Sequence, residues 1–166
     1  MQKNYPTRKN NRLEGYDYST AGYYFITICI KDRTELLGSI DTRPAIGYLP
    51  AIQLSEIGKT VETAMLQIEK KYETVTLLKH TIMPNHLHMI IALNHTIPDG
   101  RTMAAPTIST IVNQFKGYAT RQVGFPIWQK LFHDHIIRNH EEYLQIWQYI
   151  DENPAKWTED RYYVEM

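Results

Sequence analysis

The sequence predicts an α+β fold in which helices pack against one antiparallel sheet. Two periodicities support this prediction. Runs rich in β-branched and aromatic residues interleave with runs whose apolar residues recur every three or four positions. The predicted strands are short enough to pair antiparallel, and the chain of 166 residues has the length of one domain. We find no internal repeat and expect no second domain.

The strongest predicted strand covers residues 22–32, where β-branched and aromatic side chains dominate. Two further strands are predicted over residues 75–82 and 86–93, on either side of a Met-Pro-Asn interruption. Residues 128–137 form a shorter predicted extended segment. Residues 36–48 hold turn residues between two apolar pieces, which indicates a hairpin.

Three segments with apolar residues at helical spacing are predicted helices: residues 54–72, 107–123 and 139–152. Ser55 and Asn139 can cap the first and last of these helices, because their side-chain oxygens accept hydrogen bonds from backbone N–H groups. Pro154 ends the last helix. Residues 94–106 contain prolines and a glycine, which predicts a loop.

We expect a basic polar arm over residues 1–19, a single domain over residues 20–157 and a tail over residues 158–166. Apolar residues make up 43% and charged residues 22% of the chain, which is typical of a globular protein. No apolar run approaches the length of a membrane-spanning helix, and the first residues lack the apolar stretch of a signal peptide. With a single cysteine, Cys29, no internal disulfide can form, so we expect a soluble cytoplasmic protein.

The charge is balanced in total but uneven along the chain. The net charge of +0 argues against a polycation that coats nucleic acid. Residues 1–12 and residues 101–133 nevertheless each contain four basic residues and no acidic residue. These two segments could form a surface that faces phosphates, or they could be ordinary solvated surface.

A His-Leu-His sequence at residues 86–88 is the first candidate functional motif. Side chains two residues apart in a strand point to the same face, about 7 Å from each other, so both imidazoles could bind one metal ion. Histidine is a common ligand of transition metals. The alternative is a pair of ordinary surface or core histidines, and a metal site also needs a third protein group.

The last predicted helix places Tyr149 and Asn153 on one face, because they are four residues apart. They lie at the edge of the apolar stripe, where a tyrosine can act as a nucleophile and an asparagine oxygen can bind a hard cation. The alternative is that Tyr149, one of 12 tyrosines, only packs the helix.

A second histidine pair, His133 and His135, has the same spacing with an acid between its members. It could bind zinc, support another site or contact DNA beside Arg138, and we favour the structural or contact role. Cys29 lies in a predicted strand, where a small buried hydrophobic residue is expected.

Six motifs follow one another along the chain: Leu13-Glu-Gly-Tyr-Asp-Tyr18, Gly22-Tyr-Tyr-Phe-Ile-Thr-Ile28, Met83-Pro-Asn-His-Leu-His88, Gln114-Phe-Lys-Gly117, Trp128-Gln129 with Asp134-His-Ile-Ile-Arg-Asn139, and Tyr149-Ile-Asp-Glu-Asn-Pro154. In this order they resemble the motifs of the REP-associated tyrosine transposases. That family is related to the single-tyrosine transposases of bacterial insertion sequences, within the His-hydrophobe-His nuclease superfamily. The resemblance extends over residues 10–157.

The resemblance implies a ferredoxin-like or RRM-like antiparallel sheet, with the histidine pair on a central strand and the tyrosine on a C-terminal helix. It implies a Mg²⁺ or Mn²⁺ ion bound by His86, His88 and Asn153, where many insertion-sequence relatives carry Gln in place of the asparagine. Tyr149 would be the nucleophile of an enzyme that nicks and rejoins single-stranded DNA near palindromic hairpins through a 5′-phosphotyrosine intermediate.

The resemblance also implies single-stranded or hairpin DNA as the partner. The residues expected to contact DNA are Arg8, Lys9, Arg12, Gln114, Lys116, Arg121 and Arg138. We expect a monomer, with a homodimer as the alternative. Two other functions stay open: a catalytically silent hairpin-binding module of the same fold, and a zinc hydrolase, which the lack of a glutamate base near His86 disfavours.

Overall fold

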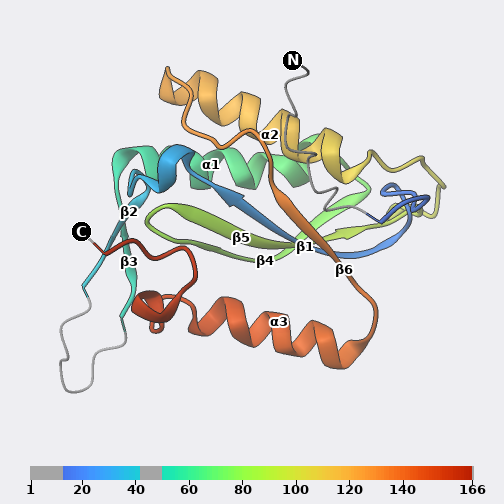
Figure 1. The fold of residues 1–166 in the computed structure, drawn as a ribbon. Coiled ribbons are helices and arrows are strands. Elements are labelled where there is room, and N and C mark those ends of the chain that lie inside the picture. The colour runs from blue at the N-terminus through green and yellow to red at the C-terminus, as the bar shows by residue number, and fades with distance from the viewer. Residues whose placement is uncertain (1–12, 42–49, 166) are drawn as a thin grey trace, which may run out of the picture.

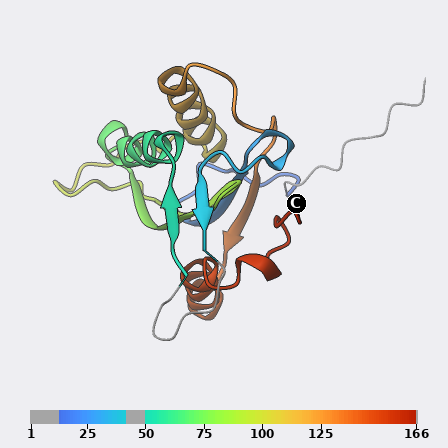
Figure 2. The same cartoon turned by 90° about the vertical axis from the view of Figure 1, so that its left-hand side faces the viewer.

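The computed structural model describes residues 13–41 and 50–165. Its centre is a four-stranded antiparallel sheet in the order β4-β5-β1-β6 (Figure 1). The strands are β1 (Gly22–Cys29), β4 (Val75–Ile82), β5 (His86–Leu93) and β6 (His133–Ile137). The short strands β2 (Gly38–Ile40) and β3 (Ile52–Leu54) pair with each other beside this sheet (Figure 2). The predicted DNA contacts Arg8, Lys9 and Arg12 lie outside the described residues.

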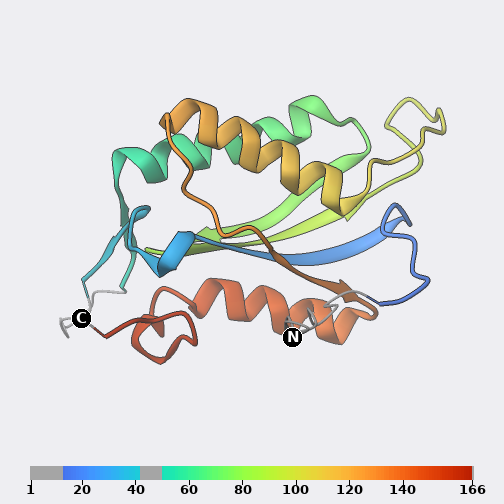
Figure 3. The same cartoon turned by 45° about the horizontal axis from the view of Figure 1, so that its top comes forward.

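Helices cover both faces of the sheet. The helices are α1 (Glu56–Lys71), α2 (Ile108–Val123) and α3 (His140–Glu152), with short 3₁₀ turns at η1 (Lys31–Arg33) and η2 (Trp157–Glu159). Helices α1 and α2 lie side by side on one face, and α3 lies on the other (Figure 3). None of the helices in the described ranges has the length and apolar character needed to cross a bilayer.

Strand β5 is buried along its whole length because it carries side chains that pack on both faces. Leu87, Met89 and Ile91 belong to the larger core, beneath α1 and α2. Ile90 belongs to the smaller core beneath α3. Alternation along the strand therefore turns His86 and His88 toward α3, the same side as Ile90.

Side-chain caps define where the helices begin. Ser55 Oγ accepts a hydrogen bond from the Gly58 amide at 3.0 Å, at the start of α1. Asn139 Oδ1 accepts one from the Glu142 amide at 2.8 Å, at the start of α3. Helix α2 ends at Gly124, whose left-handed backbone (φ of 92°) suits glycine.

The predicted α+β class, with helices on an antiparallel sheet, is confirmed, and the observed helices lie within the predicted ranges. One strand prediction was too long. The strand predicted over residues 22–32 ends at Cys29, because the chain enters η1 with positive φ at Asp32 and Arg33. In the extended segment predicted over residues 128–137, the strand covers His133–Ile137, and Trp128 forms an isolated bridge to Ile30.

The hairpin predicted over residues 36–48 is displaced along the chain. Its first strand, β2, pairs with β3, whose residues Ile52–Leu54 lie beyond the predicted segment. Residues 42–49, which contain the rest of the predicted turn, lie outside the described residues. The pattern of apolar and turn residues indicated a hairpin but did not fix the strand that closes it.

Candidate metal and nucleophile site

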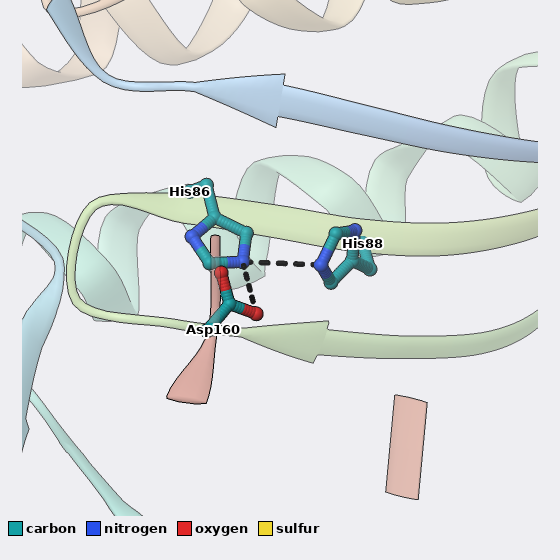
Figure 4. Close-up of side chains that lie close together, drawn as sticks. All are labelled: His86, His88 and Asp160. Carbon is teal, nitrogen blue, oxygen red and sulfur yellow. Dashed lines mark hydrogen bonds and ion pairs between the residues drawn. The ribbon is translucent and has the colours of Figure 1, made fainter. Parts of the chain in front are cut away.

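The two histidines of strand β5 meet on the face of the sheet that α3 covers. Their Nε2 atoms lie 3.1 Å apart (Figure 4). Both residues are buried, with exposed fractions of 0% for His86 and 1% for His88. Burial lowers the pKa of both rings, because removal from water disfavours the charged imidazolium. Two neutral rings therefore face each other across a short gap.

The outer nitrogen of His86 is held by its neighbour in sequence. His86 Nδ1 lies 2.9 Å from Asn85 Oδ1. The amide nitrogen of Asn85 donates to the carbonyl oxygens of Arg33 and Tyr162, at 3.2 and 2.8 Å, so Oδ1 is the atom that faces the ring. An amide oxygen only accepts, so Nδ1 carries the proton. His86 Nε2 consequently presents a lone pair to the site.

His88 is held from the neighbouring strand. Thr27, its register partner in β1, places Oγ1 at 2.8 Å from His88 Nδ1. The hydroxyl can either donate or accept, so His88 Nε2 is either a donor to His86 or a second lone pair. Binding of a cation by both histidines would require the second state, in which each Nε2 offers a lone pair.

A carboxylate completes the group of possible metal ligands. Asp160 Oδ2 lies 4.0 Å from His86 Nε2, and its side chain is 1% exposed (Figure 4). One ligand atom from each of His86, His88 and Asp160 lies within 4.8 Å of the others. Sequence reasoning missed Asp160, because the tail after Pro154 has no periodicity that assigns its side chains to a face.

Asn153, predicted as the third ligand, lies at the end of α3 and is buried. Its amide nitrogen donates to Asp160 Oδ2 at 2.6 Å. Its Oδ1 is buried without a hydrogen-bond partner in the described part of the chain. An unpaired buried oxygen costs about 1–3 kcal/mol, so its position beside the Asp160 carboxylate fits a bound cation.

Tyr149 is the solvent-facing member of the cluster, with an exposed fraction of 40%. Its hydroxyl lies 3.2 Å from His88 Nε2 and 3.4 Å from Asp160 Oδ2. Phe25 packs edge-on against its ring at 6.1 Å. Partial burial, followed by the charge of Asp160, raises the pKa of Tyr149 to about 12. The phenol is therefore protonated at neutral pH.

The residues after α3 pack over the histidine rings. The ring of Tyr162 lies 4.5 Å from that of His86, and the ring of Trp157 lies 6.0 Å away. Asp160 and Tyr162 thus reach the site from a segment that the sequence assigned partly to a tail. The donors gathered here are two imidazole nitrogens with amide, carboxylate and phenol oxygens, a mixture that suits Mn²⁺ better than the oxygen-preferring Mg²⁺.

The structure therefore brings together His86, His88, Tyr149 and Asn153, and it places elsewhere those predicted DNA contacts that lie in the described residues. Gln114 and Arg121 are exposed on the outer side of α2. Lys116 is partly buried, and its Nζ donates to the carbonyl oxygens of Gln129 and Lys130, at 2.7 and 3.1 Å. Arg138 is exposed where β6 leads into α3.

The second histidine pair lies on the edge strand β6. His135 Nε2 lies 2.6 Å from Glu142 Oε1, which links the strand to the first turn of α3. Within the part of the chain that the structure describes, no cluster of three metal-ligating side chains includes His133 or His135. This arrangement agrees with a structural or contact role.

Two Haemophilus influenzae proteins are similar to the chain. One, described as uncharacterized, is 32% identical over 176 residues, which cover 95% of this chain and 94% of that protein. The other, which carries the provisional name REP-associated tyrosine transposase, is 26% identical over 149 residues, covering 84% of this chain and 74% of that protein. No family model matches the chain.

A solved structure shares the fold. It is described as a REP-associated tyrosine transposase bound to a REP hairpin, and it superposes with a TM-score of 0.61 at 22% identity. The superposition covers 88% of this chain and 74% of that chain.

Proposed function

Because the chain belongs to a family of proteins related to the REP-associated tyrosine transposases, as its motifs predicted, we propose that it nicks and rejoins DNA through a covalent link to Tyr149. The observation that carries this proposal is the position of the Tyr149 hydroxyl, 3.2 Å from His88 Nε2. A nucleophile, two facing imidazoles and a carboxylate meet within one small cluster. Attack of a tyrosine on a phosphodiester needs such groups, which supply the nucleophile and hold a cation beside the phosphate.

We infer that a divalent cation, Mn²⁺ or Mg²⁺, would be held by the Nε2 atoms of His86 and His88 and by oxygens of Asn153 and Asp160. When bound, such a cation neutralises a non-bridging phosphate oxygen and stabilises the charge that grows in the transition state. Asn85 and Thr27 orient the two rings through their outer nitrogens, so that both Nε2 atoms point into the site.

Tyr149 must lose its proton as it attacks, because its pKa is raised to about 12. Asp160 Oδ2, at 3.4 Å, is the atom placed to accept that proton, because the lone pair of His88 Nε2 would bind the cation. Attack forms a bond between Tyr149 Oη and phosphorus and breaks the bond from phosphorus to the 3′ oxygen, which takes up the proton that Tyr149 gave to Asp160. The products are a 5′-phosphotyrosine and a free 3′-OH, and reversal rejoins the strand without ATP.

For the substrate we propose single-stranded DNA that carries a hairpin. The solved relative with this fold is described as bound to a REP hairpin. The partial exposure of Tyr149 gives a DNA strand a route to the nucleophile from solvent. We further propose that the protein acts as a monomer in the cytoplasm, as expected from the sequence.

The test is a Tyr149→Phe substitution assayed with labelled hairpin DNA and Mn²⁺ on a denaturing gel. We expect the wild-type protein to form a covalent adduct and the variant to form none, because the phenyl ring has no nucleophilic oxygen. The matched control is Tyr143→Phe on the same helix, which should still form the adduct. An adduct that survives in Tyr149→Phe would remove this tyrosine from the mechanism.

A second candidate function is a catalytically silent module that binds hairpin DNA. The packing of Tyr162 on His86 favours it, because both histidine rings are buried and only Tyr149 faces solvent. Hairpin binding by the wild-type protein with no adduct in the presence of Mn²⁺ or Mg²⁺ would support this candidate over the enzyme.

A further inference from the structure

A groove lies between the side chains of α1 and α2. These two helices cover the face of the sheet opposite α3 (Figure 1). The volume of the groove is about 630 Å³. The side chains that define its chemistry are Lys70, Lys71, Tyr72, Gln114, Tyr118 and Arg121. None of the residues that line it is acidic. The groove contains none of the residues of the histidine and tyrosine cluster, so it is a separate feature of the surface.

Both helices supply cations to the groove. Tyr72 Oη donates to Gln114 Oε1, which fixes the end of α1 against that residue of α2. Lys71 stands over the Tyr72 ring, with Nζ 5.7 Å from its centroid, so the lysines lie at this end. Arg121 lies further along α2, and its guanidinium turns back toward Gly117, which is about 4.5 Å along the helix axis from Gln114. Helix dipoles explain a lysine or arginine near the C-terminal end of each helix, but they do not explain the absence of acids among the lining residues.

The chemistry of these side chains matches a nucleic-acid backbone. Each phosphate of the backbone carries one negative charge, which a lysine or arginine side chain can neutralise. Tyr118 presents a ring that is 36% exposed inside the groove. Tyrosine rings stack on unpaired bases, and side-chain amides such as that of Gln114 bind phosphate and base edges. An acidic peptide would satisfy the cations but would leave these groups unused.

We propose that the groove between α1 and α2 is a second DNA site, which holds the phosphate backbone of the substrate several nucleotides from the bond that Tyr149 attacks. The proposal rests on the proposed function, because the same DNA would occupy both sites. The sheet and a helix layer about 10 Å thick separate the groove from α3 (Figure 3). The groove therefore anchors DNA and takes no part in the chemistry.

The first test measures hairpin binding by fluorescence anisotropy against salt concentration. We expect Lys71→Ala and Arg121→Gln each to weaken binding by about threefold to tenfold and to lower the log–log salt slope by about 1, because each removes one phosphate contact. The matched control is Lys59→Ala, which removes the same charge from an exposed position of α1 outside the groove. Thermal unfolding of each variant checks that the fold is kept.

The second test is lysine acetylation of the wild-type protein, read by mass spectrometry with and without hairpin DNA. We expect DNA to protect Lys70 and Lys71 while Lys59 stays reactive. Equal modification of all three lysines, or a salt slope for Lys71→Ala and Arg121→Gln equal to that of the wild type, would overturn the second site. Competition by a poly-glutamate peptide as strong as by DNA would also overturn it, in favour of an acidic protein partner.

The two proposals fail in different ways. If the protein binds DNA through Lys71 and Arg121 but forms no adduct, the proposed nicking activity is refuted and the proposed DNA site in the groove stands. If the protein forms the adduct and binds hairpin DNA equally well without these two side chains, the proposed nicking activity stands and the proposed DNA site in the groove is refuted.

Discussion

At the scale of single residues, the site depends on the atoms behind the histidines as much as on the rings themselves. Each ring has one nitrogen in the cluster and one fixed by a polar side chain, Asn85 for His86 and Thr27 for His88. Both supporting side chains are buried. Removing either would leave a buried ring nitrogen unpaired, at a cost of about 1–3 kcal/mol.

Thr27→Val tests this support, because valine keeps the shape of threonine and removes its hydroxyl. We expect the variant to lose about 1–3 kcal/mol of stability in urea unfolding. We also expect weaker Mn²⁺ binding in titration calorimetry, since the proton on His88 is then no longer held at Nδ1. Thr27→Ser keeps the hydroxyl and should resemble the wild type. Unchanged Mn²⁺ affinity in the valine variant would show that the threonine does not orient the ring.

Asp160→Asn tests the carboxylate that the sequence did not reveal. A ligand that binds only the native state at 100 times its Kd stabilises that state by about 2.7 kcal/mol. We expect Mn²⁺ to raise the Tm of the wild type and to raise that of Asp160→Asn by clearly less, because one anionic ligand is lost. Glu159→Gln, at the exposed neighbouring position, should keep the full shift. An equal shift in all three proteins would exclude Asp160 as a ligand.

Local spacing explains which members of the cluster could be predicted. His86 and His88 share a face because strand side chains alternate, and Tyr149 and Asn153 share a face because they are one helical turn apart. Asp160 follows Pro154 in an irregular segment. Its position depends on tertiary packing, which a helix or strand periodicity in the sequence does not reveal. The sequence also grouped Lys116 with Gln114 and Arg121, although its ammonium turns away to two backbone carbonyls.

At the scale of elements, the two glycines inside helices have opposite roles. A Cβ built on Gly58 of α1 would lie 1.9 Å from the carbonyl oxygen of Leu37, whereas one on Gly117 of α2 would meet only an Arg121 nitrogen, at 3.5 Å. Gly58 therefore lets the start of α1 approach the chain that leads into β2.

Substitution of each glycine by alanine should change stability in opposite directions. Alanine gains about 0.5–1 kcal/mol over glycine in a helix interior, and at Gly117 we expect this gain in full. At Gly58 the clash forces a backbone shift that costs about 1–3 kcal/mol, which exceeds the gain. The urea midpoint of Gly58→Ala should therefore be lower than that of the wild type, and the midpoint of Gly117→Ala should be higher. A stabilised Gly58→Ala would show that the contact between α1 and Leu37 can open freely.

The elements were easier to predict than their pairing. Strand β5 and the three helices follow from runs of apolar residues with clear periods. The hairpin predicted over residues 36–48 did not include the strand that pairs with β2. That strand, β3, has only three residues, Ile52–Leu54, and lies next to a longer helical pattern. The register shift between Leu77 and Lys79 in β4 has no signal in composition either.

At the scale of the whole molecule, the sheet separates two surfaces with different chemistry. Helix α3 lies on one side of the sheet, and α1 and α2 lie on the other (Figure 2). The face under α3 carries the histidines and the tyrosine, and the layer of α1 and α2 carries the cationic groove. The residues of both surfaces could be picked out from the sequence, but their placement on opposite faces could not. Strand order determines which helices share a face, and local patterns do not give strand order. A DNA molecule that occupies both sites must pass around an edge of the sheet.

This separation predicts that the effect of the groove depends on DNA length. With a hairpin substrate long enough to reach both faces, Lys71→Ala should slow adduct formation at limiting DNA, because anchoring is weakened. With a short single strand that spans only the nucleotides beside the cleaved bond, Lys71→Ala and the wild type should form adduct at the same rate, while Asp160→Asn should be slower with both substrates. Rates come from quenched time courses on denaturing gels at fixed Mn²⁺. An equal loss for Lys71→Ala with the short strand would place the groove in contact with the cleaved segment and contradict the two-face arrangement.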